Sequence, residues 1–147
     1  MSRIDENKEA VRRFLEEIWS KGDQAAMEEV LAPDFQFILA FAQLDGREAY
    51  KNLVIKNHEI FADLTYSLAS LDDVVADEQK AAAFWSMSTS NHRGTWRNVP
   101  ASGEAVAIKG MTFFRFNEAG KMTEARVQND VLKFMLTIGG VKKMYDI

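Results

Sequence analysis

The order of its periodic segments is what most constrains the fold of this chain. Up to residue 61, apolar residues recur mainly at helical spacing, and from residue 64 onward they alternate with polar residues as in strands. Helices followed by consecutive strands indicate an α+β fold rather than alternating strands and helices. We therefore expect a curved antiparallel sheet wrapped around the N-terminal helices, a cone with an internal pocket at its open end.

The N-terminal part contains two predicted helices and a strand. Asp5 is the expected N-cap of the first helix, and Gly22 ends it. Asp23 caps a short second helix, which Pro33 stops. The nearly unbroken apolar run 35–41 predicts a strand that is buried on both faces.

The rest of the chain is expected to form one helix, four strands and a last short helix. A turn at Asp45-Gly46 precedes the third helix, whose inner stripe runs from Tyr50 to Phe61. A loop rich in turn-forming residues spans 91–103. The predicted strands cover 64–69, 81–90, 106–116 and 122–130, and the last helix covers 131–138.

Composition narrows the class of protein. The 147 residues, 47% of them hydrophobic, are enough for a single domain over residues 1–147 with its own core. The net charge of −4 argues against a nucleic-acid partner, because a nucleic-acid groove needs a basic excess. The chain has no cysteine, no apolar signal core and no apolar run long enough to span a membrane. These features predict a cytoplasmic protein with no membrane partner.

Several short stretches, spread over nearly the whole chain, carry a family resemblance. They are Asn7-Lys8 to Phe14, Trp19, Gly22-Asp23, Leu31-Ala32-Pro33-Asp34-Phe35, Asp45-Gly46-Arg47, Phe61-Ala62-Asp63-Leu64, His92-Arg93-Gly94, Val99-Pro100-Ala101-Ser102-Gly103, Gly110 to Phe116, Gly120-Lys121-Met122 and Glu124 to Asp130. In this order they resemble the SnoaL-like family of polyketide cyclases, which have the nuclear-transport-factor-like cone fold. The resemblance implies acid/base chemistry on a small, largely apolar carbonyl compound, by aldol-type ring closure or proton-transfer isomerisation, without a cofactor.

The resemblance also implies site residues. Asp130 matches the family's acid/base aspartate before the last helix, and His92 matches the histidine of a His-x-Gly motif. Two positions depart from the family pattern. The four residues directly after Phe35, Gln36 to Leu39, include no histidine, and Arg126 stands where a tryptophan is common. These departures favour an alternative, a non-catalytic small-molecule-binding or dimerisation domain of the same fold.

The orientation of the last strand is open from the sequence. Alternation places Arg126, Gln128 and Asp130 on one face and Val127 and Asn129 on the other. The simplest interpretation turns the apolar set to the core and leaves Asp130 as a helix N-cap. The family interpretation turns Asp130 to the pocket, where Arg126 and Gln128 would bind substrate and Arg126 could pair with Asp130 or with a ligand oxyanion. A β-bulge could also change the register.

The remaining candidates also have two interpretations. Phe14, Trp85 and Phe114 are expected to be buried, either as core or as substrate-binding pocket wall. His92 is either a surface loop residue or a second polar group for a ligand carbonyl. With two histidines and no carboxylate cluster near them, no metal site is expected. The fold resemblance further implies a homodimer, in which a partner covers the outer face of the sheet.

Overall fold

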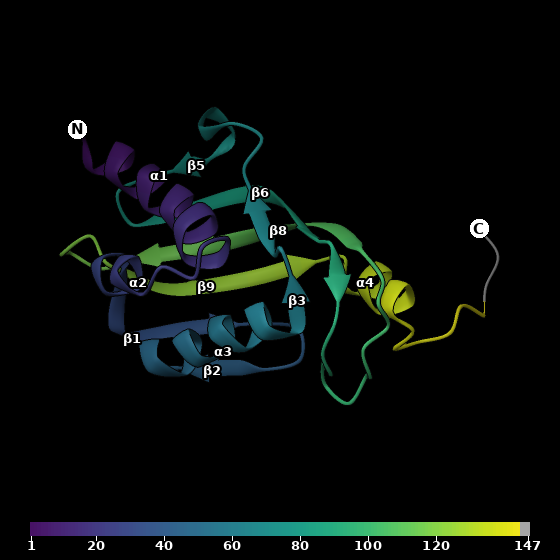
Figure 1. Ribbon diagram of the computed structural model, residues 1–147. Helices are drawn as coiled ribbons and strands as arrows, with labels where there is room; N and C mark the ends of the chain where they lie inside the picture. Colours follow the sequence, from purple (N-terminus) through teal and green to yellow (C-terminus); the bar gives the residue numbers. More distant parts are fainter. Residues whose placement is uncertain (145–147) are drawn as a thin grey trace.

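The computed structural model describes residues 1–144 and confirms the predicted α+β class. One curved sheet has the strand order β2-β1-β9-β8-β6-β4, with β5 paired to β6, and a small second sheet joins β3 to β7 (Figure 1). The strands are β1 (Leu31–Ile38), β2 (Gln43–Asp45), β3 (Phe61–Ala62), β4 (Thr65–Ser67), β5 (Val75–Ala76), β6 (Lys80–Thr89), β7 (Asn91–His92), β8 (Val106–Phe116) and β9 (Met122–Asn129).

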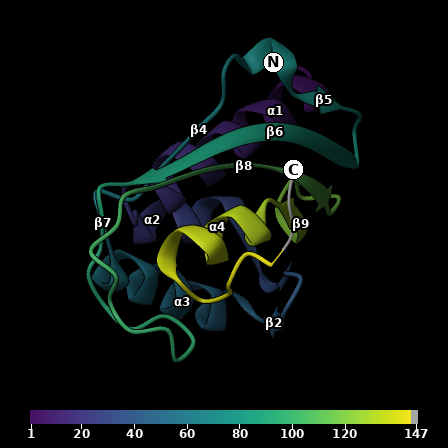
Figure 2. The same ribbon diagram turned by 90° about the vertical axis from the view of Figure 1, so that its right-hand side faces the viewer.

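Helices cover one face of this sheet and close one end of it. They are α1 (Arg3–Arg13), the π-helical η1 (Phe14–Trp19), α2 (Gln24–Val30), α3 (Arg47–Ile60), the short 3-10 helix η2 (Leu71–Asp73) and α4 (Val131–Ile138). Helices α1, α2 and α3 lie on the same side of the sheet (Figure 1), and α4 sits at the end where β9 stops (Figure 2). None of the helices within residues 1–144 is long and apolar enough to cross a membrane.

The N-terminal cap differs from the expectation. Ser2, not Asp5, is the N-cap of α1, and its Oγ accepts the Asp5 N–H at 3.1 Å. Asp5 occupies the third helical position and accepts from Ser2 in return, which completes a capping box. The prediction for Asp5 was wrong because serine and aspartate both cap helices. Only the reciprocal hydrogen bonds of the capping box show that Ser2 is the cap. Asp23 does cap α2, as expected, by accepting from Ala26 N–H.

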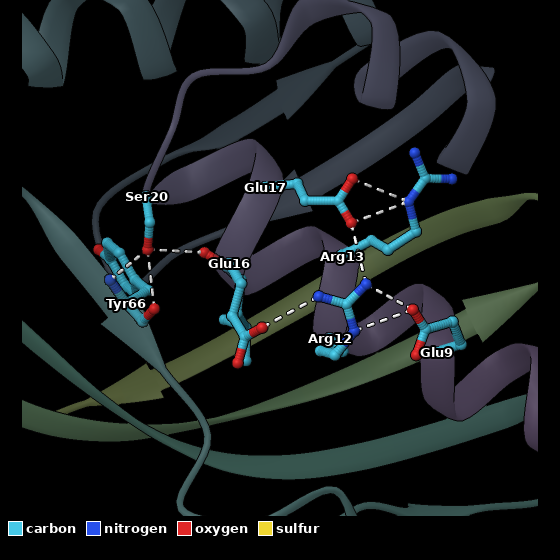
Figure 3. Close-up of polar contacts among 8 residues, drawn as sticks. Glu9, Arg12, Arg13, Glu16, Glu17, Ser20 and Tyr66 are labelled. Carbon is cyan, nitrogen blue, oxygen red and sulfur yellow. Dashed lines mark hydrogen bonds and ion pairs between the residues drawn. The ribbon is translucent and has the colours of Figure 1, made fainter.

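The end of the first helix widens into the π-helical η1. Its turn is tied to the sheet by Ser20, whose Oγ accepts the Tyr66 N–H at 2.7 Å and lies 2.7 Å from the Tyr66 carbonyl oxygen (Figure 3). On the solvent side, Arg12 pairs with Glu9 of α1, and Arg13 pairs with Glu17 of η1 (Figure 3). Short π-helical insertions are frequent at functional sites, and this one presents Phe14 and Trp19 to the interior.

The first long strand starts earlier than predicted and pairs in an unexpected direction. Helix α2 ends at Val30, and β1 begins at once, with Pro33 inside it. The strand can hold a proline because its pairing with β9 shifts register between Leu31 and Gln36, where no ladder hydrogen bond is required. The β1–β9 pair is parallel, so the sheet is mixed rather than purely antiparallel.

Aromatic side chains fill the space between the helices and the sheet. Tyr50 of α3 stacks on Phe14 at 5.6 Å between ring centroids and lies edge-on to Trp19 at 5.7 Å. Phe35 and Phe37 of β1 contact the same cluster. Most of this cluster is fully buried. This cluster fills the interior near β1, and some of its rings also border the hollow part of the molecule, which lies toward α4.

Candidate functional site

A cavity of about 280 Å³ opens between the sheet, α3 and α4. Its lining comes from long sheet strands and helices as well as loops: Phe14, Leu15, Trp19, Phe37, Leu39, Ala40, Phe41, Leu53, Lys56, Asn57, Ile60, Phe61, Leu64, Tyr66, Trp85, Met87, Thr95, Trp96, Arg97, Ile108, Thr112, Val127, Asn129, Val131 and Phe134. The volume is near the lower end of the ~300–1,000 Å³ typical of small-molecule sites. A single small and largely apolar molecule would fit this lining.

The three tryptophans of the chain, Trp19, Trp85 and Trp96, all line the cavity. Trp85 is held by a buried hydrogen bond from its Nε1 to Thr112 Oγ1, at 2.8 Å. Gly110 faces Trp85 across the β6–β8 pair and leaves room for the indole ring. Ligand binding in this cavity would therefore change the environment of every indole in the protein.

Tyr66 joins the two sides of the wall. Its ring stacks on Trp19 at 4.9 Å and contacts Trp85 at 5.1 Å. Burial raises the pKa of the Tyr66 phenol far above its ordinary value, so the hydroxyl stays protonated and can donate a hydrogen bond. Ser20 hydrogen-bonds both backbone polar groups of Tyr66, which makes Ser20 a positioning residue for this wall.

Few polar side chains reach the cavity. Asn129, at the end of β9, lies on the inner face next to Val127, and no residue within 1–144 hydrogen-bonds its side-chain amide. Asn57 and Lys56 contribute from the last turns of α3. Every lining residue belongs to the described part of the chain, and the lining includes no carboxylate and no histidine.

An aromatic and cationic group borders the opening of the cavity. The Arg97 guanidinium lies over the rings of Phe41 and Trp96, 5.2 and 5.6 Å from their centroids. Trp96 in turn packs edge-on against Phe134 of α4 at 4.8 Å. Phe41 is 49% exposed, so this group lies where the cavity meets solvent. It joins the β1–β2 loop, the loop after β7, and α4.

The structure places Asp130 at the start of α4 and outside the cavity lining. Its carboxylate accepts the Lys133 N–H at 3.1 Å as an N-cap, and its side chain is exposed. It borders a shallow groove on the outer side of the sheet with Lys109 and Lys133. The capping role is the simpler of the two sequence interpretations. A catalytic role for Asp130 stays a prediction.

Arg126 and Gln128 lie on the exposed face of β9, with Val127 between them turned to the cavity. The pairing of Arg126 with Asp130, one alternative of the family interpretation, does not form, because Arg126 Nε bonds Glu124 Oε2 at 2.9 Å instead. Arg126 lowers the pKa of Glu124, and Arg115 adds to the effect. The structure thus brings neither Arg126 nor Gln128 to the cavity. The strand therefore follows the simplest interpretation of the sequence, in which the apolar set is turned to the core.

His92 is fully buried rather than on a loop surface, and it does not line the cavity. Its Nδ1 accepts the Ser102 N–H at 3.2 Å and lies 2.9 Å from Ser102 Oγ, which places the ring proton on Nε2. Burial lowers the pKa of His92. The ring stacks on Phe61, a lining residue, at 5.3 Å. His92 therefore supports the wall of the cavity and anchors the loop that carries Trp96.

The three aromatic residues predicted as core or pocket wall do not all reach the cavity. Phe14 and Trp85 line the cavity, whereas Phe114 lies fully buried behind Phe14, 5.4 Å away and edge-on. Sequence reasoning missed Asn129 and Tyr66, although both belong to the inward set of their strands by alternation. Across residues 1–144, no three His, Asp or Glu side chains converge in a way that could hold a metal ion.

Comparison with known proteins identifies the family. The family model of SnoaL-like polyketide cyclases matches residues 9–138. No curated protein matches the sequence significantly. Among solved structures, a protein named as a SnoaL-like polyketide cyclase from Jannaschia sp. CCS1 superposes with a TM-score of 0.83, at 22% identity and with 97% of each chain covered.

Two further structures are similar. TsrD from Streptomyces laurentii has a TM-score of 0.80 at 20% identity, over 93% of this chain and 97% of its own. IdmH from Streptomyces antibioticus, named as a polyketide cyclase, has a TM-score of 0.71 at 20% identity, over 92% of this chain and 99% of its own. At these identities the likeness establishes the fold alone.

Proposed function

Since the chain belongs to the SnoaL-like polyketide cyclase family, we propose that it binds a small, largely apolar carbonyl compound and promotes its ring closure or proton-transfer isomerisation. The observation that carries this proposal is the cavity itself. It is walled by aromatic side chains, it has the size of one small ligand, and the free amide of Asn129 faces into it. A carbonyl oxygen is the ligand group that an amide N–H can hold in such a place.

The cavity would act first by orientation. In an aldol closure, a base removes a proton from the carbon beside a carbonyl, and the resulting enolate carbon bonds to a second carbonyl carbon. The new alkoxide then takes a proton. Holding the two reacting carbons in the right geometry lowers the entropic part of the activation barrier. N–H donation from Asn129 and O–H donation from Tyr66 would stabilise the enolate oxygen in surroundings that exclude most water.

Asp130 is the proposed acid/base and His92 the proposed assisting residue. Asp130 follows Asn129 directly, at the point where α4 closes the open end of the cavity. Its carboxylate would have to leave the Lys133 N–H and turn inward with the first turn of α4. His92 would contribute indirectly, by holding Phe61 and the loop that ends at Ser102.

Deuterium exchange tests this proposal without knowledge of the natural substrate. The probe is 4-cyclohexylbutan-2-one in D₂O, and NMR follows the loss of the signals of the protons beside the carbonyl. The proposal expects faster exchange with the protein, no acceleration with Asp130→Asn, and reduced acceleration with Asn129→Leu. Asn and Ser both cap helices well, so each variant removes the carboxylate and keeps the cap, and Asp130→Ser should likewise show no acceleration. Binding without exchange would sink the catalytic proposal.

A second candidate function is binding without catalysis. The observation that favours it is the absence of any carboxylate or histidine from the lining. If the protein only binds its ligand, adding the ketone would quench or shift its tryptophan emission, because all three indoles line the cavity. It would leave the exchange rate at the value for buffer, with the wild-type protein and with Asp130→Asn alike. The two measurements together separate enzyme from binder.

We also propose that the chain forms a homodimer through the outer face of the sheet. Phe84 and Met111 are cross-strand partners there, and they are 68% and 42% exposed. An apolar pair in the middle of an exposed sheet face is typical of a surface that a partner covers. Light scattering on a sizing column should give twice the monomer mass for the wild type and the monomer mass for Phe84→Glu. A wild-type monomer would contradict the proposal.

A further inference from the structure

The charged side chains that reach the cavity are all cationic. They are Lys56, near the end of α3, and Arg97, in the loop between β7 and β8. Both are exposed as well as lining, so they mark the opening rather than the interior. The interior is apolar, and no carboxylate in the lining opposes them. The site therefore has an apolar end and a positive end.

The position of Arg97 costs backbone strain. Trp96 and Val99 exchange two backbone hydrogen bonds, of 2.9 and 2.7 Å, around a two-residue turn. Arg97 and Asn98, the two central residues, have φ of 45° and 68°. Such a turn favours Asn or Gly at both positions, and an arginine there is an outlier. Strained residues of this kind concentrate at ligand sites.

The Arg97 side chain is fixed in place and still has its hydrogen-bonding capacity. The guanidinium lies over Phe41 and Trp96, and it makes no ion pair or hydrogen bond with any residue within 1–144. Stacking restrains the group while leaving its N–H donors free for an anion. Lys56 has one carboxylate partner, Glu59, at 3.7 Å, and both are about two-thirds exposed. A solvent-screened pair of this kind is weak, so Lys56 can turn to a ligand.

We propose that the ligand is an amphipathic anion, with an apolar body inside the cavity and a carboxylate at the opening between Arg97 and Lys56. This inference rests on the proposed function, because it describes the compound that the same cavity would take. The carboxylate holds one end of the molecule, and the Asn129 amide is left for a carbonyl farther inside. The ligand is therefore a keto acid or a related acidic carbonyl compound rather than a neutral one.

The test compares two probes of the same shape. 4-Cyclohexylbutanoate is the anion and 4-cyclohexylbutanamide its neutral counterpart, and neither absorbs where tryptophan does. Titration of the intrinsic fluorescence gives both dissociation constants, because every indole of the protein lines the cavity. From the strength of exposed ion pairs we expect the wild type to bind the carboxylate about fivefold more tightly than the amide. Added salt should reduce this preference.

Two double variants separate the opening from net charge. Arg97→Asn with Lys56→Gln should bind both probes equally, and asparagine keeps the turn because it tolerates positive φ. Lys109→Gln with Lys133→Gln removes the same charge from the groove on the outer side of the sheet and should leave the preference unchanged. Equal affinities in the wild type would overturn this inference and leave the proposed function standing. Failure of both probes to bind at all would overturn the two together.

Discussion

Adding one methyl group at Gly110 should distort the cavity wall. Gly110 lies on β8 between Trp85 of β6 and Asn129 of β9, its cross-strand partners. A Cβ built on Gly110 would lie 2.4 Å from Trp85 Cζ2 and 2.9 Å from Asn129 Cβ. Neither neighbour can yield easily. The Trp85 ring is held by its bond to Thr112, and the Asn129 Cβ is fixed to the backbone of a paired strand.

The size of the effect follows from opposing terms. Overpacking costs about 1–3 kcal/mol, and loss of the Trp85–Thr112 hydrogen bond adds about 1 kcal/mol. Replacing glycine by alanine in a strand returns about 0.5–1 kcal/mol of backbone entropy. We therefore expect Gly110→Ala to lower the free energy of unfolding by about 2 kcal/mol. For a chain of this length that corresponds to a fall in Tm of about 4–8 °C.

A double-mutant cycle provides the assay. Urea unfolding gives the free energies of the wild type, Gly110→Ala, Trp85→Phe and the double variant. Trp85→Phe removes Cζ2 and Cη2, the two ring atoms that the new methyl group meets. The double variant should therefore be more stable than additivity requires, by about 1 kcal/mol or more. Additive losses, or an unchanged stability of Gly110→Ala, would refute the steric reasoning.

Three more perturbations test the supports of the site. Ser20→Ala should lower the free energy of unfolding by about 1–2 kcal/mol, measured in urea, because the Tyr66 N–H loses its acceptor. Burial lowers the folded-state pKa of His92 below 6.5, so the unfolded chain protonates first as the pH falls. Stability should decrease below about pH 6.5, and His92→Gln should flatten that slope in a pH series of urea titrations. The folded-state pKa of Glu124 is lowered below 4.5 by Arg126. The ionised Glu124 therefore stabilises the folded state fully above about pH 4.5, and this stabilisation is lost in acid. In thermal unfolding, Glu124→Gln should lower the free energy of unfolding by about 1 kcal/mol at neutral pH and by little at pH ~2.

Elements whose signals are local could be predicted from the sequence. The strand 106–116 and the last helix, 131–138, form over the expected residues. Strict alternation fixes the strand, and an aspartate before an apolar run followed by two glycines fixes the helix. Asp23 caps α2 for the same reason. In each case, residues within a few positions decide the structure, and distant contacts only add to it.

Features that depend on distant partners could not be predicted. The strand β1 extends back to Leu31 because it pairs in parallel with β9, some ninety residues away. Nothing near Pro33 announces that pairing, and proline normally argues against a strand. The π-helical turn at 14–19 also has no local signal. It is held in place by Ser20, which bonds Tyr66 across the molecule.

The candidate site was predictable in kind but not in detail. Alternation does indicate which β9 residues face inward, and it includes Asn129 among them. The family resemblance instead drew attention to Asp130, one residue later and on the other face. Sequence also gave no reason to connect Arg97 with Phe41, because the two belong to separate loops that meet only over the cavity. Loop contacts of this kind are set by the whole fold.

The junction of β9 and α4 decides how the cavity can act. Asn129 is the last residue of the strand, so its side chain follows the strand alternation and faces inward. Asp130 must accept from Lys133 N–H to cap α4, which directs its carboxylate along the helix and away from the cavity. One residue therefore faces the cavity and the next caps the helix. A carboxylate can act on a bound carbonyl here only if α4 gives up its cap, so catalysis by Asp130 requires movement of α4, whereas binding through Asn129 requires none.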